Sequence, residues 1–198
     1  MIEEAPNFRP DPMPPEIAAL RDGSAAIWIF AYGSLMWDRE FPRIAAEPAL
    51  VHGYHRRFCL YSYDYRGTRT RPGLTLGLDR GGACRGIVFR LPVAEAIDTL
   101  WSREMTAPRV YDMRRLPVRT AGGGIPAFAF TVRRDHPDYA GRLTLERTAQ
   151  IIAVAAGRRG TNRDYLTGTL HHLADLGLAD RQLVRLFERV QALASARA

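Results

Sequence analysis

The most unusual carboxylate in the sequence is that of Glu104, because it falls in line with apolar residues. Val93, Ile97, Leu100 and Trp101 repeat at the spacing of one face of a helix, and Glu104 continues that face. A carboxylate on an apolar face is partly removed from water, which raises its pKa. The end of a helix also disfavours negative charge. Both effects predict a group that exchanges protons near neutral pH.

A structural role for Glu104 is equally compatible with this pattern. A glutamate at the edge of an apolar face can pair with an arginine, and Arg103 and Arg109 are both close in the sequence. The pattern alone leaves the catalytic and the structural interpretation open.

A second candidate lies in the run WIFAYGSLMW, where a strand-like segment is interrupted at Tyr32, Gly33 and Ser34 before Leu35. A strand that ends in Gly-Ser can present bare backbone N–H groups, and such groups bind carboxylates or stabilise an oxyanion. An ordinary tight turn explains these four residues equally simply. The motif on its own is weak evidence for a binding loop.

Other polar clusters have weaker claims. Arg56 and Arg57 open an aromatic strand, so one of them could meet a ligand carboxylate, or the pair could be solvated. His171 and His172 are adjacent in a predicted helix and point about 100° apart, so they cannot share one metal ion. The glycines of 122–124 lie between two strands, which is not the setting of a phosphate loop.

Length and composition predict one globular domain. The chain has 198 residues, of which 46% are hydrophobic, and no apolar run approaches the roughly 18 residues of a membrane span. The N-terminal segment lacks the basic start and apolar centre of a signal peptide, so we expect a cytoplasmic protein. Cys59 and Cys84 lie in strand-like runs and are expected to be buried and reduced.

The net charge is +7. All 28 basic residues are arginines, since the chain contains no lysine. The arginines are scattered along the chain and do not form one block. This charge favours anionic partners in general, but it does not indicate a nucleic-acid-binding protein.

Strands are predicted to dominate the first two thirds of the chain. Residues 26–32, 48–53 and 55–63 each have a strand-like pattern. Glycine-containing breaks between apolar runs predict two hairpins, one across Arg80-Gly81-Gly82 and one across 121–124.

Helices are predicted between these strands and through the last third. One begins near Pro92 and carries Glu104. The others are expected over Leu143–Ala156, over Asp164–Leu176 and after the capping residue Asp180. The expected class is therefore α+β, with a curled sheet or barrel flanked by helices and a helical C-terminal third. Residues 1–24 are expected to form an extended arm and residues 25–198 a single domain.

Several segments, in order and spacing, resemble the ChaC-type γ-glutamylcyclotransferases. The resemblance runs from about residue 27 to residue 190. It is carried by WIFAYGSLMWD, VHGYHRRFCLYSYDYRGT, RPGLTLGLD, CRGIVFRLP, WSREM, HPDYAG and AAGRRGTNRDYL. The resemblance implies a small mixed β-barrel with helices around it.

The resemblance also implies a reaction and a site. In this family the α-amine of a γ-glutamyl substrate attacks its own γ-carbonyl, giving 5-oxoproline and a free amine, and glutathione is the usual substrate. No cofactor or metal is implied. The loop of Tyr32, Gly33, Ser34 and Leu35 would hold the γ-glutamyl head, and Glu104 would be the acid and base.

The segment after Glu104 departs from the family pattern, which commonly has a glycine shortly before a tyrosine. Residues 105–111 contain no glycine, and Tyr111 falls one residue late, so specificity for the leaving group is left open. Tyr139 and Arg57 are further candidate substrate contacts. The implied partner is a small molecule, with no nucleic acid and no membrane, and a monomer is expected. A cyclotransferase for another γ-glutamyl amine and a non-catalytic binding protein on the same fold are the alternatives.

Overall fold

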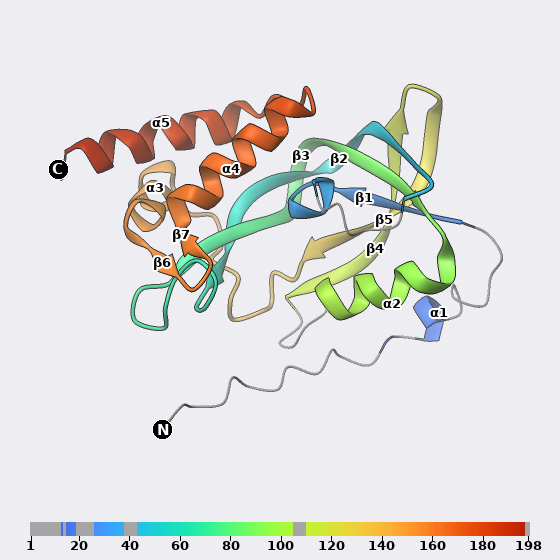
Figure 1. Cartoon of the computed structure of the whole chain (residues 1–198), viewed down its shortest axis with the longest axis horizontal. Helices are drawn as coiled ribbons and strands as arrows, with labels where there is room; N and C mark the ends of the chain where they lie inside the picture. Colours follow the sequence, from blue (N-terminus) through green and yellow to red (C-terminus); the bar gives the residue numbers. More distant parts are fainter. Residues whose placement is uncertain (1–12, 14, 19–25, 38–42, 105–109, 197–198) are drawn as a thin grey trace.

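The computed structural model describes residues 13, 15–18, 26–37, 43–104 and 110–196, and its centre is a closed barrel of five strands (Figure 1). The strand order is β1-β3-β2-β4-β5, and the barrel closes where β1 runs parallel to β5. All other neighbouring pairs in that order are antiparallel, so the barrel is mixed, as the sequence predicted. The strands are β1 (Ile27–Ala31), β2 (Ala45–Ser62), β3 (Gly73–Leu91), β4 (Tyr111–Thr120) and β5 (Gly123–Val132).

Helices lie on two sides of the barrel (Figure 1). The helix α2 (Val93–Glu104) follows β3 and runs along one side. The helices α3 (Leu145–Val154), α4 (Asn162–Asp175) and α5 (Arg181–Ser195) gather at the other end, beside the extended parts of β2 and β3. A short hairpin of β6 (Ala156–Gly157) and β7 (Gly160–Thr161) joins α3 to α4. The predicted α+β class and the helical C-terminal third are both confirmed.

Alternating residues of the strands divide the apolar side chains into two clusters. In β1, Ile29 and Ala31 belong to the larger cluster, which is shared with the helices, whereas Phe30 belongs to the smaller cluster. The smaller cluster is built from alternate residues of all five barrel strands, including Val51 and Val118, and so fills the barrel interior. Because successive side chains of a strand point to opposite faces, one set of residues fills the barrel interior and the other packs against the helices.

Two predictions about β2 and β3 were wrong, for the same physical reason. The segments 48–53 and 55–63 belong to one strand, and the predicted hairpin across Arg80-Gly81-Gly82 is the middle of β3. The pairing of β2 with β3 shifts register between His52 and Tyr54, opposite these glycines. Gly53 and Gly81 have φ values of +81° and +109°, which are costly for other residues. The glycines therefore make a bulge that bends a continuous ribbon, not a turn that ends it.

The remaining elements agree with the sequence. The hairpin of β4 and β5 turns at 121–122, within the glycine-containing segment. Thr144, Thr161 and Asp180 cap α3, α4 and α5 with side-chain oxygens that accept backbone N–H groups. Of the expected N-terminal arm, the structure describes Met13 and 15–18, where Pro15–Ala18 forms the short helix α1; the rest of the arm lies outside the described residues.

Both cysteines are free and buried, as expected. Burial raises the pKa of the Cys59 thiol to about 12, so this thiol is protonated and unreactive at neutral pH. Among the described residues, no helix is long and apolar enough to cross a membrane.

Candidate active site

The predicted binding loop begins where β1 ends inside the barrel. Tyr32 is 9% exposed, and the short 3₁₀ helix η1 (Ser34–Met36) follows directly after Gly33. The carbonyl of Gly33 accepts the N–H of Met36, so the chain reverses over three residues. Apart from its two chain neighbours, none of the residues that the structure describes comes within 4 Å of the position that a Cβ of Gly33 would occupy. The described part of the chain therefore leaves space beside the backbone of the loop, as a binding loop requires.

A buried arginine, Arg56, is hydrogen bonded to the start of this loop. Arg56 is 4% exposed, and its Nε donates to the carbonyl oxygen of Tyr32. One terminal nitrogen donates to the carbonyl of Arg85 at 2.7 Å, and the other pairs with Asp180 at 2.9 Å. The solvated alternative is wrong for Arg56, because its side chain is buried and each of its three guanidinium nitrogens donates to a protein oxygen. It instead fixes the end of β1 to the start of α5.

Three tyrosines lie close enough to the predicted catalytic carboxylate to interact with its charge. Glu104 is the last residue of α2 and is half-buried. It interacts electrostatically with Tyr32 at the end of β1, with Tyr111 at the start of β4 and with Tyr165 in α4. Tyr32 and Tyr111 also share a side-chain hydrogen bond. The structure thus brings Glu104, the Tyr32 loop and Tyr111 together, as the sequence predicted.

The three phenols stay protonated at neutral pH. Burial, with the charge of Glu104 acting in the same direction, raises the pKa of both Tyr32 and Tyr111 well above the usual value. Burial also raises the pKa of Tyr165, to about 12, although the backbone of Leu76 hydrogen bonds to its hydroxyl. Hydroxyl groups in this state are hydrogen-bond donors, which suits a pocket that must bind or stabilise negative charge.

Tyr165 is the site residue that the sequence analysis missed, although its motif NRDYL had been noted. The signal was Asn162, one turn earlier in α4. This asparagine is fully buried, accepts the N–H of Leu74 at 2.6 Å and donates to the carbonyl of Leu74 at 2.8 Å. It pins the first turn of α4 to β3, and residues three apart share a helix face. Asn162 therefore positions Tyr165.

We expect Asn162→Ala to lower the free energy of unfolding by about 2–4 kcal/mol, because two buried backbone groups of Leu74 lose their partners. Urea unfolding followed by circular dichroism measures this loss. Arg163→Ala, at the exposed neighbouring position, is the control and should change stability by less than about 0.5 kcal/mol. An Asn162→Ala protein as stable as the wild type would contradict this account of α4.

Arg57 and Tyr139, two further predicted substrate contacts, meet at a different carboxylate. The buried Asp79 accepts the hydroxyl of Tyr139 at 2.8 Å and pairs with Arg57 at 3.3 Å and with Arg134 at 2.6 Å. These bonds hold the pKa of Asp79 below its usual value against the opposing effect of burial. The structure therefore places these two residues in a separate polar cluster, and their role as substrate contacts stays a prediction.

The side chain of Cys59 lies between the Asp79 cluster and the Glu104 cluster. The thiol of Cys59 interacts electrostatically with Asp79 and Arg57 on one side. It also interacts with Tyr32 and Tyr111 on the other side. The Asp79 cluster thus adjoins the Glu104 cluster without being part of it.

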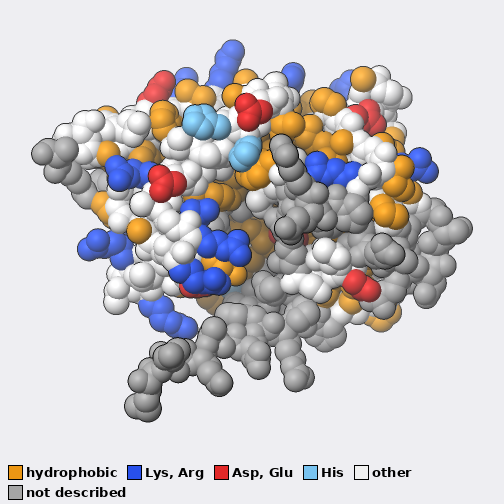
Figure 2. Space-filling model, viewed as in Figure 1, with side chains coloured by type: hydrophobic (Ala, Val, Ile, Leu, Met, Phe, Trp, Pro, Cys, Tyr) orange, Lys and Arg blue, Asp and Glu red, His pale blue; other side chains and the backbone are white. Residues whose placement is uncertain are grey.

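The face of the molecule in Figure 2 is hollowed. Hydrophobic side chains lie in the wall of the hollow, and arginine side chains lie on the side of the hollow nearer to β6 and β7.

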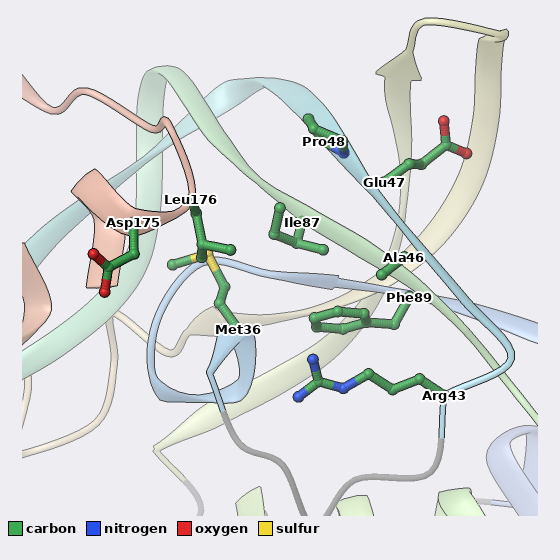
Figure 3. A pocket seen from close by; sticks show the side chains of 9 residues that line it. All are labelled: Met36, Arg43, Ala46, Glu47, Pro48, Ile87, Phe89, Asp175 and Leu176. Atoms are coloured by element: carbon green, nitrogen blue, oxygen red, sulfur yellow. The ribbon is translucent and has the colours of Figure 1, made fainter. Parts of the chain in front are cut away.

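A groove of about 360 Å³ lies elsewhere, on the outer face of β2 and β3 (Figure 3). Met36, Ile87 and Phe89 supply its apolar surface, and Arg43 stacks on the ring of Phe89 at 4.4 Å. No predicted site residue lines this groove, so we do not place the active site there. In the part of the chain that the structure describes, no group of three or more His, Cys, Asp or Glu residues could hold a metal ion.

Comparison with known structures identifies the fold. A crystal structure of a glutathione-specific γ-glutamyl cyclotransferase from yeast has a TM-score of 0.76, with 86% of this chain and all of that chain covered. The two sequences are 22% identical, so the similarity is one of fold. The barrel and its helices are therefore those of the γ-glutamylcyclotransferase fold.

The sequence comparisons identify the family. Residues 27–193 match the ChaC-like protein family. A glutathione-specific γ-glutamylcyclotransferase of Escherichia coli (strain K12) is 34% identical over 179 residues, covering 88% of this chain and 77% of the relative. γ-Glutamylcyclotransferase 2-3 of Arabidopsis thaliana is 32% identical, with 86% of this chain and 91% of the relative covered. The chain belongs to the ChaC-like family, as its motifs had predicted.

Proposed function

We propose that this protein is a γ-glutamylcyclotransferase that cleaves glutathione to 5-oxoproline and cysteinylglycine. The observation that carries the proposal is the grouping of Glu104 with three protonated tyrosines beside the open loop at Gly33. Membership of the ChaC-like family and the Escherichia coli relative support glutathione as the substrate.

The proposed reaction is an internal transfer in which Glu104 moves a proton. The carboxylate of Glu104 takes a proton from the α-ammonium group of the substrate. The freed amine attacks the γ-carbonyl, a C–N bond forms, and the amide bond to the leaving cysteine breaks. Glu104 then returns this proton to the departing nitrogen. The new ring nitrogen loses a second proton, which passes to the same amine, so that the dipeptide leaves as an ammonium ion. Because the nucleophile is tethered to the carbonyl, the site has only to hold the folded-back conformer.

The loop and the tyrosines have complementary roles in this proposal. The N–H groups of Ser34 and Leu35 open η1 and so have no acceptor within it. In the proposal they bind the carboxylate of the γ-glutamyl head or the developing oxyanion. The hydroxyl of Tyr165 can donate to the same oxygens. The hydroxyl of Tyr111 donates to the carbonyl of Leu76 at 3.2 Å and is hydrogen bonded to Tyr32, so these two tyrosines shape the wall of the pocket.

The test is release of both products from glutathione, measured by chromatography, beside γ-glutamyl-alanine and glutamine. Equal amounts of 5-oxoproline and cysteinylglycine from glutathione, in large excess over release from the other two, are expected. Turnover of another γ-glutamyl amine in preference would identify a different cyclotransferase. No 5-oxoproline from any of them would favour the non-catalytic alternative.

A further inference from the structure

We propose that Arg66 binds the terminal carboxylate of the leaving peptide, so that the enzyme selects γ-glutamyl peptides over γ-glutamyl amines without a carboxylate. This inference rests on the proposed function. It supplies the leaving-group specificity that the altered segment after Glu104 left open.

Arg66 touches the Glu104 cluster directly. It follows β2 in the loop before β3, and its guanidinium lies 4.8 Å from the centre of the Tyr165 ring. The same tyrosine interacts with Glu104. Arg66 and Glu104 therefore both lie near this one tyrosine.

The guanidinium is held at one end and free at the other. One terminal nitrogen, Nη1, donates to the carbonyls of Arg159 at 2.5 Å and Thr161 at 3.5 Å. Among the residues that the structure describes, neither Nε nor the second terminal nitrogen has an acceptor, and no carboxylate pairs with Arg66. Nε and this nitrogen form the edge of the guanidinium that binds a carboxylate with two parallel hydrogen bonds.

The surroundings of Arg66 are positive as well. Arg158 and Arg159 both stack on the ring of Tyr65 at 4.5 Å. Arg158 is neutralised by Asp64 at 2.7 Å, whereas Arg159 has no such partner among the described residues. Arg158 and Arg159 lie in the turn between β6 and β7. One carboxylate is near as well: Oδ2 of Asp164 lies 3.8 Å, and Nη1 of Arg66 3.6 Å, from the position that a Cβ of Gly160 would occupy. Because Arg66 and Arg159 are both without a carboxylate partner among the described residues, the charge at this edge still favours an anion.

The length of the leaving group limits where its carboxylate can bind. Two extended residues span about 7 Å, so the glycine carboxylate lies at most about that far from the nitrogen that Glu104 must protonate. The proposal therefore places this dipeptide between Glu104 and Arg66, both of which interact with Tyr165. The carboxylate of the γ-glutamyl head, in contrast, is assigned to the backbone of the loop after Tyr32.

The experiment compares glutathione with glutathione amide, in which the glycine carboxylate is a neutral amide and nothing else differs. Wild type, Arg66→Ala and Arg66→Gln are assayed for 5-oxoproline release, with Arg71→Ala as a charge-matched control on the same loop. We expect both Arg66 variants to lose about 10- to 100-fold in kcat/KM for glutathione. For glutathione amide they should stay within about twofold of the wild type, and Arg71→Ala should match the wild type on both substrates.

Each alternative outcome is distinct. Equal losses on both substrates would overturn the inference, because Arg66 would then act on the head group or through Tyr165. Unchanged rates on both would overturn it too. If wild type releases 5-oxoproline from neither substrate, the proposed function fails first and the inference falls with it. Thermal denaturation of each variant shows whether a loss of activity comes from unfolding. If Arg66→Ala is unfolded, the comparison of the two substrates is made with Arg66→Gln, which keeps polar donors.

Discussion

Replacing Glu104 with glutamine is expected to lower 5-oxoproline release from glutathione by about 10²- to 10⁴-fold, the usual contribution of a general acid and base. The amide keeps the size of the side chain but cannot take the proton of the α-ammonium group. The three phenols cannot replace it, because their pKa values lie above the usual range of tyrosine and they stay protonated. Initial rates at saturating glutathione measure the effect on kcat.

The matched control is Glu188→Gln, which removes the same charge from an exposed position of α5. It should leave kcat unchanged. Circular dichroism should show that both variants are folded. A Glu104→Gln protein with the rate of the wild type would show that another group moves the proton and would end the proposed mechanism.

Arg56→Met is expected to lower the free energy of unfolding by about 3–5 kcal/mol, the usual cost of breaking a buried ion pair by removing one partner. The side chain of Arg56 is 2% exposed, and its loss leaves the carbonyls of Tyr32 and Arg85 and the carboxylate of Asp180 short of a donor. Methionine fills a similar length of space, so the loss reports on the polar contacts more than on packing.

Urea unfolding measures the effect, with Arg185→Met on the exposed face of α5 as the control. The control should differ from the wild type by less than about 0.5 kcal/mol. Below the melting temperature, Arg56→Met should also raise KM, because Tyr32 loses the contact that fixes its carbonyl. A variant with wild-type stability would mean that water replaces the guanidinium at little cost.

The barrel class and most elements could be predicted because their signals are local. Alternating residues define β1 and β5, and capping residues define α4 and α5. The error at Gly81 arose because a glycine pair with positive φ serves a turn and a bulge equally well. Only the partner strand, through the register shift at Gly53, distinguishes the two.

Members of the candidate site could be proposed from the sequence where a single residue breaks its own local pattern, as Glu104 and Gly33 do. Tyr165 and Arg66 break no pattern, since a tyrosine in a helix and an arginine in a polar loop are ordinary. Their positions follow from long-range contacts such as that of Asn162 with Leu74. The pairing of Arg57 and Tyr139 with Asp79 likewise depends on three segments that only the fold brings together.

The way in which the barrel closes has a consequence for the order of folding. The ribbon of β2 and β3 joins near neighbours in the chain and can form early, whereas closure joins Ile29 to Phe128. The groups around Glu104 come from β1, α2, β4 and α4, so they meet only after this distant closure and the docking of α4. A chain that has formed its ribbon but not its barrel therefore has secondary structure without the candidate active site. If the proposed function holds, such a chain cannot cleave glutathione until folding is complete.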